Sequence, residues 1–500
     1  MTFNQMNASG TAFPANYYCT WKAQGAWRTQ NSHSAQEMRD RIDADFLFGA
    51  DGVLPALPEE VRSELIVVLD DGWDVARGTL HESNSDCGRF GSLIPDGGKF
   101  PALAALEPQE RLRALSEQVK ALGYAGLGLW VPANYYQEDP SASREARLRG
   151  AADFWTERGK WCAYADIRYL KVDWGWHGRD IEYRELMTET VKKYSPGTLM
   201  EHVVGVFDMP YDPAPEVQNA PAFRDFQELA RRTAAVSDVY RTYDVVDTLA
   251  TATTLMRVAA FFDGTLTAKD GLLGLVNVED EVLIGAALGM TVGVMRYAGQ
   301  PRFNEVIKAL RWQKLAPPFR AESGQLVCSK ELLCDRFFFD TAPEVWPYVG
   351  QKTIAQYAPA RMARCAPLAE VSALSEEQTP FVLTSRNPLT GAYTVAALPR
   401  TAPGRYKYRA DAEITVREVH TASPLGVFGS FGLLRAFFDK SLAGKRVLAR
   451  DLLTDAVQDI TPQVRCEDCT LLLDGAAAKT FTPAQNGDES EAAFVLTVTD

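Results

Sequence analysis

The first 300 residues alternate short apolar runs with stretches whose apolar residues recur at helical spacing. Residues 65–69 (LIVVL) form a continuous apolar run, as expected for a strand that is buried on both faces. Leu112, Leu115 and Val119 then follow at helical spacing, and residues 125–130 form the next apolar run. Repeated strand–helix–strand units predict a parallel sheet. At this length the pattern favours a (β/α)8 TIM barrel over an open doubly wound sheet.

The pattern changes after Pro317 and Pro318. Short alternating runs follow, such as residues 381–384 and 414–419, separated by turn signals such as Asn486-Gly487. This texture predicts a C-terminal antiparallel β-sandwich. We therefore expect a catalytic barrel over residues 1–320 and a β-sandwich domain over residues 321–500.

Composition and charge narrow the class of protein. With 46% apolar and 23% charged residues, the chain has the profile of a soluble globular protein. Its net charge of −13 disfavours binding to nucleic acid or to an anionic membrane surface. The longest apolar stretch, residues 282–295, is broken by three glycines and is shorter than a membrane span. The N-terminus has neither a basic start nor an apolar core, so we expect a cytoplasmic protein.

The cysteines and histidines point away from metal chemistry. Eight cysteines are scattered along the chain, which is unlike a disulfide framework. Cys466 and Cys469 form a single CxxC without a second half, so we expect reduced thiols, with a structural zinc site or a redox pair as the alternative. None of the five histidines is spaced i, i+4. We expect no metal and no cofactor.

Carboxylates and tryptophans gather where the predicted barrel strands end, which is where a TIM barrel carries its chemistry. By this criterion the candidate site residues are Asp70, Asp71 and Trp73 after the second strand, Trp130 at the end of the third, Lys171, Asp173 and Trp174 around the end of the fourth, Glu201 on the fifth, and Arg241 and Asp244 at the end of the sixth.

This combination of residue types suits a sugar. Sugar hydroxyls bind carboxylates, lysine and arginine, whereas the apolar ring faces pack on aromatic side chains. Two carboxylates flanking a glycosidic bond supply a nucleophile and a general acid/base. Each residue alone has a simpler explanation: Asp71-Gly72 could be a turn, a strand-end aspartate a helix cap, and a tryptophan core packing. Joint placement at consecutive strand ends favours a carbohydrate site.

Several segments resemble the α-galactosidases of glycoside hydrolase families 27 and 36. The resemblance covers about residues 15–300, and its most specific parts are two blocks about 100 residues apart. The first block is residues 70–73 (DDGW), and the second is residues 171–173 (KVD). Residues 127–130 (LGLW) are similar to the strand between them in those families, and residues 242–247 (TYDVVD) resemble the family 36 acid/base segment.

The resemblance implies a role for each candidate residue. Asp173 would be the nucleophile and Lys171 would hold it charged. Asp244 would be the acid/base, with Asp238 and Asp247 as alternatives because the spacing from Arg241 is one residue shorter than in family 27. The remaining roles concern the sugar: Asp70 and Asp71 would bind the 4- and 6-hydroxyls, and Glu201 and Arg241 the 2-position. Trp130 or Trp174 would pack against the pocket wall, and Trp73 is a further substrate-binding candidate.

The sequence thus predicts a retaining α-glycoside hydrolase that releases terminal α-galactose from oligosaccharides or glycosides. The alternatives within this class are an α-N-acetylgalactosaminidase, a β-L-arabinopyranosidase and a raffinose-synthase-like transglycosidase. A catalytically silent carbohydrate-binding protein is the alternative of another class. The expected partner is a carbohydrate substrate, and a homo-oligomer is compatible with the sequence.

Overall fold

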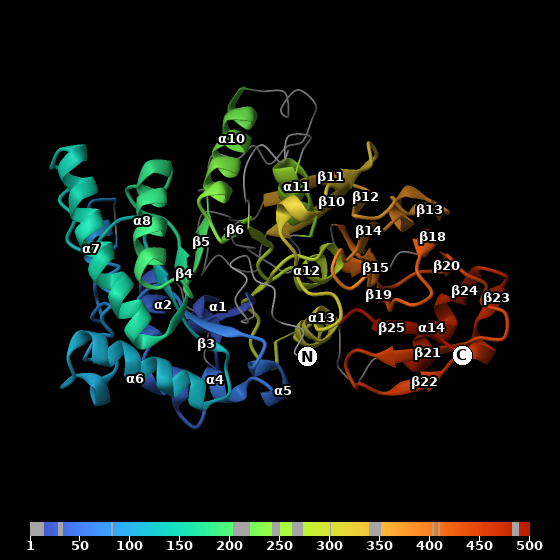
Figure 1. The fold of residues 1–500 in the computed structure, drawn as a ribbon, viewed down its shortest axis with the longest axis horizontal. Helices are drawn as coiled ribbons and strands as arrows, with labels where there is room; N and C mark the ends of the chain where they lie inside the picture. Colours follow the sequence, from blue (N-terminus) through green and yellow to red (C-terminus); the bar gives the residue numbers. More distant parts are fainter. Residues whose placement is uncertain are drawn as a thin grey trace.

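The computed structural model describes residues 15–28, 34–81, 84–203, 221–242, 251–262, 274–300, 302–339, 352–402, 405–408, 411–482 and 490–500. Figure 1 shows two regions side by side. The N-terminal region, blue to yellow, combines strands with long helices, whereas the C-terminal region, orange to red, consists mainly of strands. Among the described residues no helix is both long and apolar enough to cross a membrane.

Eight parallel strands form the barrel. They are β1 (Tyr17–Cys19), β2 (Ile66–Leu69), β3 (Gly126–Val131), β4 (Ile167–Val172), β5 (Leu199–Val203), β6 (Val239–Arg241), β7 (Leu275–Asn277) and β8 (Gly293–Val294). They pair in sequence order from β1 to β7, and β8 pairs with β1. A parallel bridge between Asn277 and Thr291 closes the ring between β7 and β8. The predicted (β/α)8 barrel is confirmed.

Helices surround this barrel. The short ones are α1 (Trp21–Ala26), α2 (Ala35–Arg41), α3 (Ala44–Phe48), α4 (Val53–Ala56), α5 (Glu59–Arg62) and α12 (Val282–Leu288), and the longer ones are α6 (Pro108–Ala121), α7 (Arg144–Ala165), α8 (Ile181–Tyr194), α10 (Pro221–Ala235), α11 (Thr251–Phe262) and α13 (Asn304–Gln313). Helix α6 buries Leu112, Leu115 and Val119, the stripe that predicts it. Asp180 caps the amino-terminal end of helix α8, where its side chain accepts a hydrogen bond from the Tyr183 amide.

Strand alternation places the candidate residues inside the barrel. Apolar interior positions form one cluster with Val68, Leu199 and Val239 among its members. Side chains two residues apart on a strand point to the same side. Asp70 therefore follows Val68, Glu201 follows Leu199 and Arg241 follows Val239 into the interior, one layer nearer the carboxyl ends of the strands. The polar layer lies at the end of the barrel where TIM-barrel chemistry occurs.

The C-terminal region contains two packed sheets. The larger has the order β22-β21-β25-β19-β15-β14-β12-β9, and the smaller has the order β13-β18-β20-β24-β23. The strands of the larger sheet are β9 (Leu326–Cys328), β12 (Arg361–Arg364), β14 (Phe381–Arg386), β15 (Tyr393–Leu398), β19 (Leu425–Gly429), β21 (Arg446–Asp451), β22 (Val457–Asp459) and β25 (Ala493–Thr499). Those of the smaller sheet are β13 (Glu370–Ala373), β18 (Ala412–Val419), β20 (Leu433–Phe438), β23 (Arg465–Glu467) and β24 (Thr470–Asp474).

The predicted sandwich is confirmed, but its sheets are mixed rather than wholly antiparallel. The pairs β12–β14, β15–β19 and β18–β20 are parallel. The chain leaves β15, passes through β18 of the other sheet and returns as β19, and such a crossover lets two neighbouring strands run the same way. Two hairpins, β10 (Leu332–Phe339) with β11 (Lys352–Pro359) and β16 (Arg400–Ala402) with β17 (Arg405–Tyr408), and the helix α14 (Gly475–Phe481) complete the region.

The larger sheet is covered on both faces. On one face Val395 and Val427 share a core with Leu434 of the smaller sheet. On the other face Ala396 belongs to the same cluster as Trp312 of α13. Strands β15 and β19 are consequently buried at every position, whereas β20 alternates between buried and partly exposed side chains. The barrel and the sandwich therefore share a continuous apolar interface.

All eight cysteines carry free thiols, and Cys466 on β23 is exposed. Among the described residues no group of three or more histidine, cysteine, aspartate or glutamate side chains is arranged to hold a metal ion.

Candidate active site

Asp173 follows β4 directly and is held at both carboxylate oxygens. The Trp130 indole Nε1–H donates a hydrogen bond to Oδ2 at 3.0 Å. The Arg241 Nη2 forms an ion pair with Oδ1 at 3.1 Å. The Asp173 side chain is 14% exposed, whereas that of Arg241 is completely buried. The carboxylate is thus fixed from below and keeps an accessible part.

The electrostatic surroundings favour the ionised form of Asp173. Burial by itself raises the pKa of this carboxyl, but the charges of Arg241 and Lys171 and the hydrogen bond from Trp130 outweigh it, so the pKa is lowered. A fixed, ionised and partly accessible carboxylate can attack an electrophilic carbon or stabilise a developing positive charge.

Lys171 and Asp70 form a second charged pair in the same layer. Lys171 lies two residues before Asp173 on β4, and its Nζ donates to Asp70 Oδ2 at 2.8 Å. The Cys19 thiol at the end of β1 donates to the same Asp70 oxygen at 3.1 Å. Burial raises the pKa of Cys19 well above its ordinary value, which keeps the thiol protonated and able to donate. This pair offers a donor and an acceptor side by side at the barrel mouth.

Arg241 also contacts two carboxylates that are fully buried, those of Glu201 and Glu279. Its Nε lies 3.2 Å from Glu201 Oε1, and its Nη1 donates to Glu279 Oε1 at 3.2 Å. Glu201 Oε2 accepts hydrogen bonds from Tyr169 Oη and Asn277 Nδ2, both at 2.7 Å. Burial raises the pKa of Glu201 despite the opposing charge of Arg241. These groups form a polar floor beneath Asp173.

Aromatic side chains line one side of the mouth. The Trp73 indole donates to the backbone oxygen of Trp130 at 3.1 Å. The ring of Trp174 lies 4.9 Å from that of Trp130, measured between centroids. The His81 ring stacks on Trp174 at 4.2 Å and an interplanar angle of 30°. Since Trp73 and Trp130 are buried and Trp174 is partly exposed, this wall runs outward from Asp173.

Asp71 does not join this cluster. Its Oδ2 accepts a hydrogen bond from Arg39 Nε of α2 at 2.6 Å. As the immediate neighbour of Asp70, it lies on the opposite side of the chain from the interior position, which explains the different partner. Burial raises the pKa of Asp71 to about 7 although the Arg39 charge opposes this.

The assignment of Asp238 as the alternative acid/base residue is wrong. Asp238 precedes β6, and its Oδ2 binds Lys192 Nζ at 2.8 Å and the Met200 amide at 2.9 Å. It therefore lies at the amino-terminal end of the strands, opposite Asp173. The other two acid/base candidates, Asp244 and Asp247, lie outside the described residues.

Sequence reasoning missed several members of this site. Tyr17 and Cys19 belong to a strand of only three residues. Asn277 ends an equally short strand, and Glu279 lies in the turn two residues beyond it. The alternation of apolar and polar residues in residues 275–279 (LVNVE) is the signal that could have revealed a barrel strand there. Arg39 lies on the short helix α2 and His81 on a connecting segment, and no pattern in the sequence indicates the partner of either.

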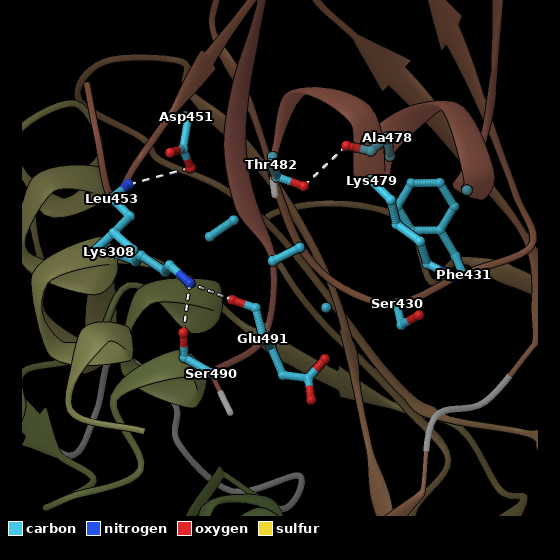
Figure 2. A pocket seen from close by; sticks show the side chains of 14 residues that line it. Lys308, Ser430, Phe431, Asp451, Leu453, Ala478, Lys479, Thr482, Ser490 and Glu491 are labelled. Atoms are coloured by element: carbon cyan, nitrogen blue, oxygen red, sulfur yellow. Dashed lines mark hydrogen bonds between the residues drawn. The ribbon is translucent and has the colours of Figure 1, made fainter. Parts of the chain in front are cut away.

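A cavity of about 170 Å³ lies elsewhere, between α13 and the sandwich (Figure 2). Lys308 of α13 extends toward it, and its Nζ donates to Ser490 Oγ at 2.6 Å and to the Glu491 backbone oxygen at 2.9 Å. Its lining, which includes Phe431 and Asp451, contains none of the barrel-mouth residues. The lysine ties the two regions together at this cavity.

No protein-family model and no curated protein matches the chain. Among solved structures, a Bacteroides fragilis protein provisionally named an alpha-galactosidase aligns with a TM-score of 0.42 and 10% identity, covering 98% of this chain and 80% of its own. A family 27 β-L-arabinopyranosidase from Geobacillus stearothermophilus aligns with a TM-score of 0.41 and 11% identity, covering 97% of both chains. A Bacillus halodurans protein provisionally named an alpha-N-acetylgalactosaminidase aligns with a TM-score of 0.41 and 12% identity, covering 99% of both. With TM-scores below 0.5, none of these activities carries over to the present chain.

Proposed function

We propose that this chain is a retaining α-glycoside hydrolase that releases terminal α-galactose. The observation that supports the proposal most strongly is Asp173 itself. Its carboxylate lies at the carboxyl end of β4, bound to Trp130 and paired with Arg241, with a lowered pKa and an accessible part. A nucleophilic carboxylate in a retaining glycosidase needs these properties.

In the first step an oxygen of Asp173 attacks the anomeric carbon, and the bond from that carbon to the leaving oxygen breaks. Asp244 gives its proton to the leaving oxygen. In the second step Asp244 takes a proton from water, the water oxygen attacks the same carbon, and the carbon–Asp173 bond breaks. Two inversions at one carbon retain the configuration. Asp244 enters this scheme from its position three residues after Arg241 on the sequence.

Binding of the sugar follows from the surrounding groups. Lys171 and Asp70 offer a donor and an acceptor to adjacent hydroxyls, and Asp71 would serve the neighbouring hydroxyl after a change of partner from Arg39. Trp174, the partly exposed member of the aromatic wall, would pack on an apolar face of the substrate, with Trp73 and Trp130 behind it. Glu201 and Arg241 form the floor of the site and would act on the 2-position from there.

Galactose is the preferred sugar because a glutamate near the 2-position leaves little room for an N-acetyl group. A panel of p-nitrophenyl glycosides tests this choice. The α-galactoside should be cleaved fastest. Faster cleavage of the N-acetylgalactosaminide or of the β-L-arabinopyranoside would overturn the proposed specificity for galactose. Transfer to added sucrose in place of water would indicate a transglycosidase.

Proton NMR of the reaction tests the stereochemistry. The α-anomer of free galactose should appear first and then mutarotate. Early accumulation of the β-anomer would contradict a covalent intermediate on Asp173. Saturable galactose binding without turnover of any glycoside would indicate that the protein binds carbohydrate and is not a catalyst.

A further inference from the structure

Arg241 is the common partner of three carboxylates, and one of them has no part in the scheme above. We propose that Glu279, assisted by Tyr17, is a positioning residue that orients the Arg241 guanidinium toward Asp173. The inference rests on the proposed function, because it assigns to Glu279 a role in preparing the nucleophile.

The geometry of the guanidinium is the first argument. Its three nitrogens face three different acids: Nη2 lies 3.1 Å from Asp173, Nε 3.2 Å from Glu201 and Nη1 3.2 Å from Glu279. A guanidinium is planar and rigid, so two fixed contacts determine where the third nitrogen points. Glu201 and Glu279 are completely buried, whereas Asp173 is partly exposed. The two buried acids therefore set the direction of the contact with Asp173.

The second argument is that Glu279 is itself firmly held. Its backbone N–H donates to Asn277 Oδ1 at 2.8 Å, and the residue adopts φ 51°, a left-handed conformation that costs energy for a side chain with a Cβ. The same Asn277 side chain donates from Nδ2 to Glu201 Oε2 at 2.7 Å. The side-chain amide of Asn277 thus contacts both Glu201 and Glu279 and fixes their relative position.

Tyr17 links the same two acids from β1. Its hydroxyl lies 3.0 Å from Glu279 Oε1 and 3.3 Å from Glu201 Oε1. A tyrosine hydroxyl has one hydrogen to donate, so it donates to one acid and accepts from the other only if that acid is protonated. The shorter of the two contacts is the one to Glu279, which makes Glu279 the preferred acceptor of this hydrogen. Tyr17 and Arg241 thus bind the same oxygen of Glu279, so Tyr17 helps to hold Glu279 beside the guanidinium.

Two substitutions of Glu279 test whether its contact with Arg241 matters: one variant keeps the contact and the other removes it. Glu279→Gln keeps an oxygen that accepts from Arg241, so kcat/KM should stay within about tenfold of the wild type. Glu279→Ala removes the contact, and we expect kcat/KM to fall about 100-fold, the size of effect that a small misplacement of a reacting group produces. The acid limb of the kcat/KM profile, which reports ionisation in the free enzyme, should move to higher pH in the alanine variant and not in the glutamine variant.

Tyr17→Phe should lie between these variants and show a smaller shift of the acid limb. Glu305→Gln, which alters a fully buried carboxylate elsewhere, is the matched control: assayed where it is folded, it should keep the wild-type profile. Equal behaviour of the glutamine and alanine variants, or an acid limb that does not move in the alanine variant, would overturn the proposal.

A readout without turnover keeps the two hypotheses distinguishable. The pKa of Asp173 follows from the pH dependence of the unfolding free energy, taken as the difference between a protein with Asp173 and its Asp173→Asn variant. This pKa should be higher with Glu279→Ala than with Glu279 present. If it is higher but no glycoside is cleaved, the positioning role stands and the proposed reaction fails. If it is unchanged while the wild type cleaves glycosides, the positioning role fails alone.

Discussion

Two buried arginine–carboxylate clusters lie close together along the chain and differ in charge balance. In the barrel cluster, defined as Arg241 with Asp173, Glu201 and Glu279, one guanidinium faces three carboxylates. In the outer cluster, defined as Arg296 and Arg302 with Asp280 and Glu305, two guanidinium groups face two carboxylates. The neighbouring residues Glu279 and Asp280 belong to different clusters.

The outer cluster is closed as well as balanced. Arg296 pairs with Asp280 at 3.1 Å and with Glu305 at 2.9 Å, and no side chain in the cluster is more than 6% exposed. Backbone groups complete it: Asp280 Oδ1 accepts from the Met295 amide, and Glu305 Oε1 accepts from the Glu491 amide of the sandwich. A balanced and closed cluster holds the scaffold together. The unbalanced barrel cluster, which reaches solvent at Asp173, is suited to chemistry.

The largest expected effect tests the reactive side of this comparison. Asp173→Asn removes the nucleophile while preserving its shape, so kcat should fall by a factor of about 10⁴ or more. The fold should remain intact, because asparagine keeps the shape of the side chain and its one oxygen can still accept from either Trp130 or Arg241. Activity assays on a freshly purified variant, with circular dichroism and galactose binding as controls, check this. Turnover near the wild-type rate would remove Asp173 from the mechanism.

A substitution in the outer cluster should lower stability and leave kcat unchanged, the reverse of the result expected for Asp173→Asn. Glu305→Gln leaves two buried arginines short of a counter-charge, and breaking a buried pair in this way costs about 3–5 kcal/mol of unfolding free energy. Urea unfolding measures the loss. The kcat of the folded fraction should equal that of the wild type, and a large drop in kcat would mean that the two clusters are coupled.

The second acid of the reaction should behave differently from both clusters. Asp244→Ala removes a proton donor and should slow the cleavage of oligosaccharides by about 10²–10⁴. A p-nitrophenyl leaving group needs little protonation, so its release should suffer less, and added azide should restore turnover by attacking the intermediate. Asp247→Ala is the matched variant. If azide rescues it and not Asp244→Ala, the acid/base assignment moves to Asp247.

The smallest expected effect concerns pH and the surplus of carboxylates. Burial raises the pKa of Glu201 in the folded state, so the folded protein binds a proton there more tightly than the unfolded chain. Stability from this group is lost as pH rises from the unfolded pKa of about 4.3 toward the folded value. Glu201→Gln lacks this loss, and its unfolding free energy relative to wild type should improve between pH 5 and pH 7. A change in the other direction would show that Glu201 is held ionised.

The sequence indicated the barrel because several of its strands are long enough to leave a continuous apolar run between helical patterns. Residues 65–69 and 167–172 each fill a strand that is buried along nearly its whole length. The site could be predicted only where a polar residue follows such a run, as Asp173 does. Glu279 could not, because it lies in a turn two residues after a strand of only three residues, and its partner Tyr17 lies 262 positions away.

The direction of strands in the sandwich was also beyond the sequence. Alternating runs such as residues 414–419 indicate a strand with one buried face but not which sheet it enters. The parallel pairing of β15 with β19 depends on β18 crossing to the other sheet, a tertiary choice. Similarly, Asp71 and Asp70 are equivalent in the sequence pattern, and only the alternation of the folded chain sends one to Arg39 and the other to Lys171.

The sheet that is covered on both faces has a practical consequence for anyone who wishes to engineer this molecule. Trp312 donates its indole N–H to Thr394, and any side chain grafted at Gly426 would meet the same indole ring at 2.8 Å. A barrel transplanted without β15 and β19 would expose the apolar surface around Trp312 that packs on these strands, and it would aggregate. Substitutions in this interface should therefore succeed when the facing residues of the barrel and the sandwich are changed together. Residues around the partly exposed Trp174 can be changed one at a time.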